Sequence, residues 1–450
     1  MSEPTTAGPR PAVLIVTDLV ILSRHYRLID EARRRGLVPL AVFGPETPAD
    51  RLAAHRADPD HPLAALAEVV HVADCSLDTL LPAIQPLLAR YEVRAVVNCG
   101  EVFVEAAGTI AECLGLPGPG AHAARVCRNK LLQRVAAPAL SPRWTVLHPA
   151  GRAAAADWRV FPAVLKPVAR MSSSGVQRID GPAQLVDAVR TYPADEVLLV
   201  EQLVSGPEYS VESLVHQGQL VWSGVTAKRT TEEAGRFFAE TGHRSPAPGL
   251  AEADRRILLQ ANAELLEAVH FDSGMTHAEF RLHEGRAVLM EVAGRPPGGA
   301  IAKLWQLTGE IEVEPALLDL MLGCRPAAGP ARRQAAQLYL DHPHGVLRGV
   351  GSGPDVPVAW VTEDGRWPEF DAAAADHPAR CHAVVVTKSR GDLLGDQVSN
   401  GDRAVSVIVD CPLDGDLDAV ADRFAAAVRI DADPPSAVPG TLRDRAEATV

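Results

Sequence analysis

Closely spaced cysteine pairs are missing from this sequence. Its seven cysteines are odd in number, lie far apart and never form a C-x-x-C pair: Cys75, Cys99, Cys113, Cys127, Cys324, Cys381 and Cys411. This distribution argues against a disulfide framework and against a zinc knuckle. We therefore expect reduced thiols, most of them buried.

Long hydrophobic runs are also missing. A membrane-spanning helix needs about 18 or more consecutive apolar residues, and the best candidate, residues 12–22, is broken by Asp18. The N-terminal residues MSEPTTAGPR have neither the basic nor the apolar region of a secretory signal. We expect a soluble cytoplasmic protein that does not engage a membrane.

Positive charge and aromatic residues are scarce. The 450 residues include 44 Lys plus Arg against 57 Asp plus Glu, a formal charge of −13, which argues against a nucleic-acid or anionic-membrane surface as the main function. Any anion must therefore be held locally. Aromatic residues make up 4%, so Ala, Val and Leu must fill the cores. The 47% hydrophobic content, with 35 Gly and 36 Pro, is typical of a globular chain of two or three domains.

The first part of the chain predicts an open parallel sheet without a dinucleotide site. Strand patterns at 12–16, 38–43 and 94–98, with a helical pattern at 26–35, are typical of βαβ units. The first strand continues into TDLVILSR and lacks the G-x-G-x-x-G that would hold a dinucleotide pyrophosphate. We assign residues 1–123 to this α/β domain and disfavour a dinucleotide-binding function.

The rest of the chain changes character. Residues 124–326 predict an α+β domain. Its strand patterns fall at 163–166, 196–202, 210–214, 220–225, 276–282 and 287–292, and its helical patterns fall at 182–192, 253–269 and 314–322. Residues 327–430 predict a strand-rich subdomain that ends in a helix at 417–429. Residues 431–450 predict a tail. No repeat with a period of 20–50 residues is evident.

Two glutamates provide the sharpest chemical signal. The strands THAEFRL and AVLMEVAGR flank His283-Glu284-Gly285, and a hairpin centred on Gly285 would pair Glu279 directly with Glu291. Like charges opposite each other repel. A divalent cation between them reverses this effect, and Mg²⁺ is commonly held by one or two carboxylates plus substrate phosphates. The alternative is a solvated hairpin face on which the pairing is coincidental.

Upstream segments add groups suited to a nucleotide. Lys166 ends a predicted strand, and Ser172, Ser173, Ser174 and Gly175 form a small-residue turn whose N–H groups and hydroxyls can cradle phosphates. In LLVEQLVSGPEYSVES, the connection 201–204 can present backbone groups to an adenine edge, and Glu208 can reach ribose hydroxyls. Taken singly, these features are compatible with a plain loop and a surface glutamate.

In order along the chain, these motifs resemble the ATP-grasp superfamily, in the branch of bacterial L-amino-acid (dipeptide) ligases. The resemblance rests on G-L-P-G followed by N-K, V-L-K-P, S-S-S-G-V, V-E-Q-L-V-S-G-P-E-Y-S-V-E, F-F-A-E-T-G-H-R-S-P-A and A-E-F…M-E-V-A-G-R-P-P-G-G. It implies an ATP-grasp fold, with a pre-ATP-grasp domain before it and a strand-rich subdomain after it. The implied ligands are ATP and Mg²⁺, with Lys130 and Lys166 on phosphates, Glu201, Gln202 and Val204 at adenine, Glu208 at ribose, and Glu279 and Glu291 on magnesium.

This sequence differs from the family pattern at one metal-binding position. The family pattern E-x-N-x-R places a metal-binding Asn where this chain has Ala293, which puts a second metal position in doubt. Arg295 is retained on the strand face of Glu291. The resemblance implies that Arg295 and the Gly298 N–H stabilise the oxyanion at an attacked carbonyl.

Further residues are candidates for substrate contact. The resemblance implies that Glu240 and His243 face the substrate, where a carboxylate can hold an ammonium and an imidazole can assist deprotonation; the alternative is a satisfied loop pair. Lys228 and Arg229 face either phosphate or a substrate carboxylate, or are surface charges. Glu101 follows a strand at the carboxyl end of the sheet, where open sheets bind ligands. Neighbouring Cys99 has no evident paired histidine, so we do not expect a nucleophile there.

Together these observations predict an ATP-dependent ligase that joins a small-molecule carboxylate, an amino acid's, to an amine through an acyl phosphate. A carboxylase-type enzyme is disfavoured because P-P-G-G follows Arg295 where Q-V-E-H is required. A purine-biosynthesis-type ligase and a non-catalytic ATP-binding sensor stay open. We expect a homodimer, which is usual among similar proteins.

Overall fold

The N-terminal part forms a parallel sheet. The computed structural model describes residues 8–233, 237–353 and 356–434. The first sheet has the strand order β3-β2-β1-β4, and its strands are β1 (Arg10–Thr17), β2 (Val38–Phe43), β3 (Glu68–His71) and β4 (Tyr91–Asn98). Residues 12–16 of β1 are fully buried, as expected for a parallel strand covered on both faces. The helices α1 (Leu19–Leu22), α2 (Arg27–Arg34), α3 (Ala49–Ala57) and α4 (Leu77–Arg90) connect these strands, and α5 (Val104–Cys113), α6 (Ala121–Arg128) and α7 (Lys130–Ala136) follow β4.

A small antiparallel unit follows. Its sheet has the order β5-β8-β6-β7, built from β5 (Trp144–Leu147), β6 (Ala163–Pro167), β7 (Gln177–Ile179) and β8 (Leu198–Gln202), and it packs with α8 (Pro182–Val189). Leu165, Leu185 and Val200 lie in a hydrophobic core that belongs to this unit alone. The unit therefore has its own core, separate from the large central sheet.

The central sheet has nine strands in the order β13-β12-β9-β10-β11-β14-β19-β17-β16. Its strands are β9 (Glu208–His216), β10 (Gln219–Thr230), β11 (Glu240–Ser245), β12 (Gly274–His283), β13 (Arg286–Ala293), β14 (Arg333–Tyr339), β16 (Val358–Trp360), β17 (Arg380–Val386) and β19 (Val405–Pro412). The β11–β14 pair joins residues on either side of position 327. The strand-rich C-terminal part is thus hydrogen-bonded into the same sheet as the middle of the chain.

The remaining elements cover this sheet. They are the helices α9 (Glu252–Ala268), α10 (Ile301–Thr308), α11 (Val313–Met321), α12 (Val361–Asp364) and α13 (Leu417–Ala425), and a small sheet of β15 (Gly345–Gly351), β18 (Leu393–Leu394) and β20 (Arg429–Asp433). One hydrophobic cluster includes Ile15 of β1, Trp305 of α10 and Leu317 of α11. It anchors the N-terminal sheet against the helices that follow the β12–β13 hairpin.

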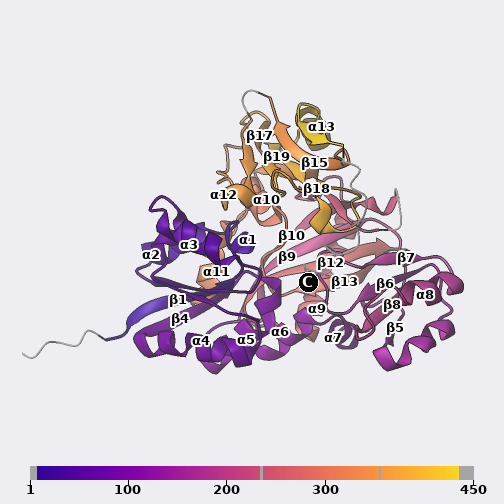
Figure 1. Ribbon diagram of the computed structural model, residues 1–450, viewed down its shortest axis with the longest axis horizontal. Coiled ribbons are helices and arrows are strands. Elements are labelled where there is room, and N and C mark those ends of the chain that lie inside the picture. The colour runs from indigo at the N-terminus through magenta and orange to yellow at the C-terminus, as the bar shows by residue number, and fades with distance from the viewer. Residues whose placement is uncertain (1–7, 234–236, 354–355, 435–450) are drawn as a thin grey trace, which may run out of the picture.

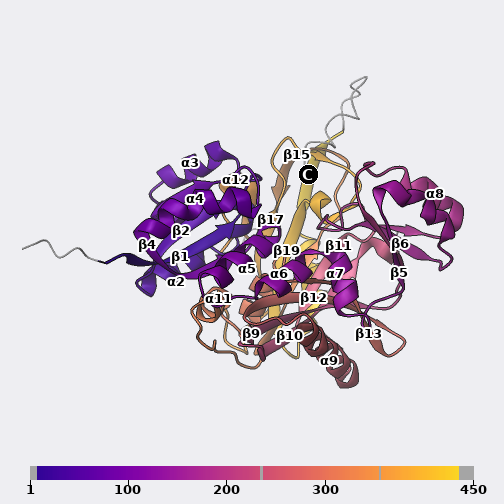
Figure 2. The same cartoon turned by 90° about the horizontal axis from the view of Figure 1, so that it is seen from below.

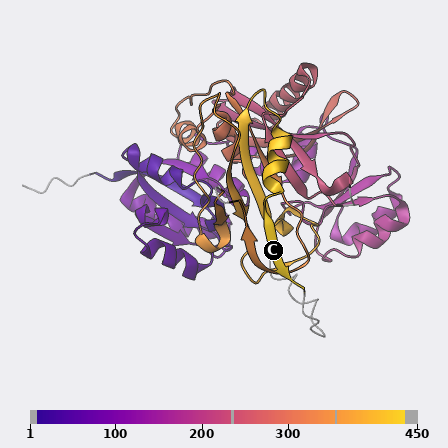
Figure 3. The ribbon, with the colours of Figure 1, turned by 90° about the horizontal axis from the view of Figure 1, so that it is seen from above.

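The views in Figures 1 and 2 place the N-terminal unit at one side and the β5–β8 unit at the other, with the central sheet between them. Figure 3 shows the C-terminal elements, orange to yellow, lying over the middle of the molecule. Three parts of the chain therefore surround the β9–β13 region, which carries the glutamate pair.

The predicted α/β and α+β parts are confirmed: an open parallel sheet precedes sheets in which most neighbouring strands are antiparallel. Several details differ from the sequence predictions. The last helix ends at Ala425, because the chain turns at 426–428 and enters β20, which runs to Asp433 inside the segment predicted as a tail. Residues 435–450 of that segment lie outside the described residues.

The cysteines are partly as expected. All seven are free, and Cys99, Cys127 and Cys411 are buried. The expectation of mostly buried thiols is wrong for Cys113 and Cys324, which are exposed because Cys113 is the last residue of α5 and Cys324 lies just beyond the end of α11. No helix within the described part of the chain is long and apolar enough to cross a membrane.

Candidate functional site

A β-bulge sets the register of the glutamate pair. Glu279 lies directly opposite Glu291, as predicted, but the hairpin is not centred on Gly285. Its turn is the two-residue Glu284-Gly285, whose φ angles are +49° and +74°, and His283 pairs with Arg286. The register then shifts between Glu279 and Phe280, which leaves Met290 as the extra residue.

The bulge changes which side chains face inward. In a regular strand, adjacent residues point to opposite faces. Here Met290 and Glu291 both line one cavity, together with Ala293. The bulge therefore supplies an apolar side chain and a carboxylate from consecutive positions, and it restores the pairing that a two-residue turn alone would have displaced.

The cavity has a volume of about 290 Å³ and is formed by all three parts of the chain. Among the residues that line it, Arg24 and Glu101 come from the N-terminal unit, and Asn400 and Arg403 come from the C-terminal part. The sequence-predicted residues on its wall are Lys130, Lys166, Ser172, Ser173, Glu201, Gln202, Val204, Glu208, Lys228, Glu240, Glu279, Glu291, Arg295 and Gly298. Candidates spread over about 170 positions thus converge on one space.

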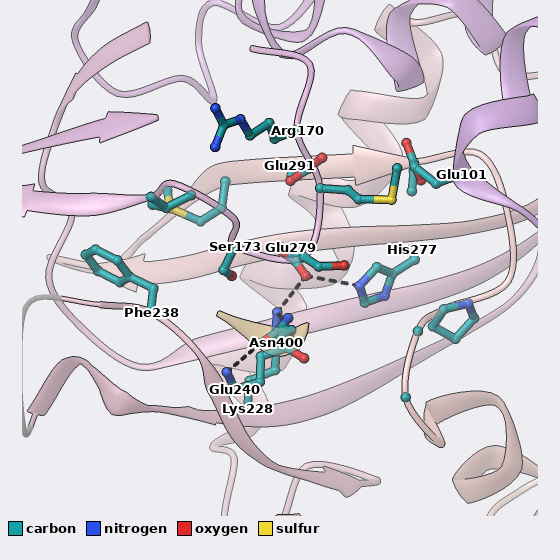
Figure 4. A pocket seen from close by; sticks show the side chains of 18 of the residues that line it. Glu101, Arg170, Ser173, Lys228, Phe238, Glu240, His277, Glu279, Glu291 and Asn400 are labelled. Carbon is teal, nitrogen blue, oxygen red and sulfur yellow. Dashed lines mark hydrogen bonds and ion pairs between the residues drawn. The ribbon is translucent and has the colours of Figure 1, made fainter. Parts of the chain in front are cut away.

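Lys228 is the centre of the charged cluster. Its Nζ lies 2.6 Å from Glu279 Oε1, 2.7 Å from Glu240 Oε1 and 3.0 Å from Glu208 Oε1. Figure 4 shows Lys228 and Glu240 close together, with His277 beside Glu279. Burial alone would lower the pKa of Lys228, but the three carboxylates raise it well above its ordinary value. Lys228 therefore stays charged and holds the three carboxylates together.

Glu291 has a separate lysine. Lys130 Nζ lies 3.0 Å from Glu291 Oε1 and donates to the carbonyl oxygen of Arg170 at 2.7 Å. Lys130 is buried at the start of α7, directly after Asn129, whose side chain accepts from the N–H groups of Leu131 and Leu132. This cap fixes the start of the helix, and with it the position of Lys130.

The glutamate pair fits a divalent cation that is completed by phosphate. Glu279 and Glu291 use Oε1 in their lysine contacts, and no hydrogen bond to either Oε2 is found in residues 8–233, 237–353 and 356–434. No group of three or more His, Cys, Asp or Glu side chains suited to a metal occurs within these same ranges. Two carboxylates alone do not complete the coordination shell of a metal ion. Mg²⁺ is commonly bound in this way, with phosphate oxygens and water as its remaining ligands.

Lys166 is held by a buried carboxylate. Glu201 Oε2 lies 2.6 Å from Lys166 Nζ, and Glu201 Oε1 accepts from Arg134 Nε at 2.5 Å. Burial would raise the pKa of Glu201, but the charges of Arg134 and Lys166 lower it to about 2. The Glu201 side chain thus positions Lys166, and only the backbone of 201–204 is available for an adenine edge.

The backbone at Val204 is compatible with that interpretation. The N–H groups of Gln202 and Leu203 donate to the carbonyls of Arg143 and Pro162. No hydrogen bond from the Val204 N–H is found in the part of the chain that the structure describes, and Val204 lines the cavity. One backbone donor beside the cavity is therefore without a partner among the described residues.

The serine loop faces the cavity with only part of its length. Ser172 and Ser173 have φ angles of +58° and +59° and line the cavity, whereas Ser174 and Gly175 do not. Gly175, at φ +70°, presents its carbonyl to the Tyr192 hydroxyl at 2.6 Å. The conformation of Gly175 therefore stabilises the turn, and Ser172 and Ser173 are the residues of this loop that can contact a ligand.

Glu240 and His243 are adjacent, but they have different exposure. His243 Nε2 lies 3.1 Å from Glu240 Oε2, yet His243 is fully buried and is not on the cavity wall. Arg403 Nη1 donates to the same Glu240 oxygen at 3.0 Å. Arg229 lies away from the cavity, near Asp418. Of this group, Glu240 and Lys228 reach the cavity, and His243 orients Glu240 from behind.

The segment after β13 carries the predicted oxyanion groups. Arg295 Nε donates to Glu101 Oε2 at 2.6 Å, and Gly298 lies on the wall just before α10. A Cβ at Gly299 would meet the Tyr339 hydroxyl at 2.9 Å, which explains the small residue there. Burial raises the pKa of the neighbouring Cys99 to about 12, in agreement with the absence of a nucleophilic role.

Sequence reasoning missed several residues of this site. Asn400 accepts from the Glu240 N–H at 2.8 Å, and its own N–H donates to the Ser172 carbonyl at 3.0 Å, so it joins the serine loop to β11. His277 bridges Glu212 and Glu279 at 2.7 and 3.1 Å. His277 could have been found, because it lies two positions before Glu279 on the same strand face. Nothing in the sequence near Asn400 indicates its partners.

Comparison with known proteins identifies the domain that holds this site. A model of the ATP-grasp domain matches residues 159–303. The chain carries an ATP-grasp domain. The matched segment contains Lys166, the serine loop, Lys228 and the Glu279–Glu291 pair.

Similar proteins support the same fold. The chain is 25% identical to uncharacterized protein y4rH of Sinorhizobium fredii, over 75% of this chain and 70% of that protein. It is 31% identical to a D-alanine–D-alanine ligase of Stutzerimonas stutzeri over 40% of this chain, and it spans 60% of that ligase's length. The crystal structure of an L-amino acid ligase from Bacillus licheniformis matches with a TM-score of 0.71 at 19% identity, over 94% of this chain and 99% of that one.

Proposed function

We propose that this ATP-grasp protein is a ligase that forms an amide bond between a carboxylate, an amino acid's, and an amine, with release of ADP and phosphate. The observation that carries the proposal is the Glu279–Glu291 pair on the wall of a cavity that is also lined by buried lysines and by Arg295 and Gly298. The cavity thus offers a phosphate-binding part beside a group that can stabilise negative charge on a carbonyl oxygen. This juxtaposition is suited to moving a phosphoryl group onto a carboxylate and then replacing it.

The residues would divide the work as follows. Lys130, Lys166 and the Ser172–Ser173 turn bind phosphate oxygens, and the Val204 N–H meets the base. Glu279 and Glu291 hold Mg²⁺, which when bound neutralises charge on the triphosphate. Because Glu201 and Arg134 fix Lys166, and Asn129 fixes the start of the helix carrying Lys130, these cations are positioned before ATP enters.

The second half of the reaction needs groups for developing charge. A carboxylate oxygen is a poor leaving group, so phosphorylation of the carboxylate precedes attack by the amine. The Arg295 guanidinium and the Gly298 N–H are suited to the tetrahedral oxyanion, and such donors contribute about 2.7–4 kcal/mol each in comparable sites. Glu101, paired with Arg295, keeps the guanidinium on the cavity wall.

Formation of the products tests this proposal. We expect ADP, phosphate and an amide to form in equal amounts when the protein is supplied with Mg²⁺-ATP and a panel of single and paired amino acids. Oxygen-18 in the carboxylate substrate should appear in the released phosphate, one atom per turnover. Phosphate without the label would exclude phosphorylation of the carboxylate. ATP binding without turnover on any substrate would favour the ATP-binding sensor, which Ala293 suggests.

The partners follow from the reaction. We propose a small-molecule carboxylate and amine as substrates, no nucleic acid, and a homodimer as the working form. Size-exclusion chromatography with light scattering tests the assembly, and a mass near the chain's 47.8 kDa would contradict it.

A further inference from the structure

Arg24 is a cation on the cavity wall that pairs with no carboxylate of the described residues. It follows α1 in the N-terminal unit, and it lines the cavity together with Glu101 and Arg295. Within the described residues it forms no ion pair, and its Nε is shielded from solvent without a hydrogen-bond partner. Burying a guanidinium donor without an acceptor costs free energy, and a bound anion that accepts hydrogen bonds from Arg24 would offset this cost.

The protein holds this guanidinium in place without neutralising it. The Arg24 guanidinium lies 5.3 Å from the centre of the Trp367 ring. The backbone N–H of Trp367 donates to the backbone carbonyl of Ser23 at 3.4 Å, which ties the C-terminal segment to the residue before Arg24. An aromatic face orients a guanidinium while leaving its N–H edge free for a planar anion.

The surroundings of Arg24 are positive. Burial is the main cause that lowers the pKa of Arg24 to about 10; Tyr339 opposes this shift, and the charges of Arg403 and Arg295 add to it. Arg295 and Arg403 each have a glutamate partner, Glu101 and Glu240. Three arginines thus gather at this end, and Arg24 is the one without a carboxylate among the described residues.

Nearby acidic groups do not serve as its partner. Asp18 is buried on the same wall, but no contact of 4 Å or less between Asp18 and Arg24 is found in the part of the chain that the structure describes. Glu314 is taken by His25 and Lys303, at 3.0 and 3.2 Å. No carboxylate of the described residues is therefore available to pair with Arg24, and the cavity that it lines is open to an anionic ligand.

The geometry points to Arg24 as the binding group for a substrate carboxylate that does not react. This inference rests on the proposed function, and it narrows the substrate class: one of the two substrates is a free α-amino acid that keeps its carboxylate through the reaction. The predicted triphosphate groups, Lys130, Lys166 and the serine loop, come from other parts of the chain. Arg24 shares its wall with Glu101 and the Arg295–Gly299 segment, where the acyl group would be attacked.

A binding experiment without turnover tests the inference. The full-length protein, with Mg²⁺ and a non-hydrolysable ATP analogue, is titrated with each of the twenty L-amino acids and with the corresponding amino-acid amides. We expect at least one amino acid to bind ten or more times more tightly than its amide, because the amide lacks the charge that Arg24 meets. In Arg24→Gln this preference should disappear, while the affinity for the ATP analogue changes less than threefold.

Two further variants separate binding from folding. Arg24→Lys should retain part of the preference, since a point charge replaces the fork of donors. Arg27→Gln is the matched control: it lies on the next helix, where it pairs with Glu312 at 3.0 Å, and the preference should be unchanged. Thermal unfolding of each variant shows whether it is folded.

Three results would overturn the inference. These are a parent protein that binds every amino acid and its amide equally, an Arg24→Gln protein that keeps the preference, and an Arg24→Gln protein that loses the ATP analogue instead. The outcome is separable from the proposed function. If the parent prefers an amino acid over its amide but forms no amide bond, the carboxylate site is retained and the ligase function is rejected. If it forms an amide bond without that preference, the ligase function is retained and the carboxylate site is rejected.

Discussion

At the scale of single residues, the site is a set of buried charges that hold one another. Glu208, Glu240 and Glu279 surround Lys228, and Glu279 also contacts His277. A buried charge left without its partner is costly, often about 3–5 kcal/mol. Each substitution here therefore changes both the ligand site and its neighbours, so informative variants keep the shape of the side chain and remove one charge.

Glu291→Gln is such a variant. We expect it to abolish ADP formation while the protein stays folded, because a neutral amide cannot hold a divalent cation against the triphosphate. Far-ultraviolet circular dichroism and a steady-state ADP assay measure the two effects. Glu284→Gln, on the turn of the same hairpin, is the control that should keep full activity. Turnover of Glu291→Gln within threefold of the parent would reject the metal assignment.

His277 gives the site a pH dependence. Burial alone would lower its pKa, but hydrogen bonds to Glu212 and Glu279 raise it from 6.5 to about 9. A raised folded pKa stabilises the protein fully below pH 6.5, and this contribution is lost as the pH rises through about 9.

We therefore expect the free energy of unfolding to fall by about 3 kcal/mol between pH 6 and pH 10 through this residue. Urea unfolding of His277→Gln should show a correspondingly flatter profile. His344→Gln, an exposed histidine paired with Asp396, should keep the parent profile. Equal slopes in the parent and His277→Gln would contradict the assignment.

At the scale of elements, the β12–β13 hairpin depends on a turn and a bulge. Its two turn residues both have positive φ, the geometry of a type I′ turn, which favours Asn-Gly. Glu284 is therefore the less suitable residue, and Gly285 the required one. The bulge at Met290 then places Glu291, the proposed metal ligand, opposite Glu279.

We expect Gly285→Ala to lower the free energy of unfolding by about 1 kcal/mol, and Glu284→Asn to raise it by a few tenths of a kcal/mol. Neither change should alter the KM for ATP, because a Cβ at Gly285 meets no atom within 4 Å and the turn lies outside the cavity wall. Chemical denaturation and steady-state kinetics provide the two measurements. A stabilised Gly285→Ala protein would contradict the turn geometry.

At the scale of the whole molecule, the C-terminal part shares both a sheet and a cavity with the ATP-grasp domain. It extends the central sheet through β11–β14, and it supplies Asn400 and Arg403 to the cavity. If it is removed, β11 becomes an exposed edge that presents unpaired backbone groups.

We therefore expect a chain ending at residue 326 to be insoluble or unfolded, and the full chain to show no separate unfolding transition for residues 327–430. Differential scanning calorimetry and limited proteolysis test this expectation. A soluble, ATP-binding fragment 1–326 would contradict it. A chain shortened to residue 434 is the control, and it should unfold like the parent because β20 is retained.

The sequence by itself determined the local features. Apolar runs predict β1, β2 and β6 close to their observed bounds, and the spacing of Glu279 and Glu291 around a turn indicates their pairing. These features depend on periodicity and on residues close together in the chain.

The convergence of the charges was decided only by the tertiary structure. Asn400 is joined to Ser172, and Arg134 and Lys166 both pair with Glu201. Arg24, which pairs with no carboxylate of the described residues, lies beside Trp367. Each of these arrangements involves elements far apart in the sequence. Their contacts follow from how three sheets pack around one cavity, and no local pattern of residues encodes that packing.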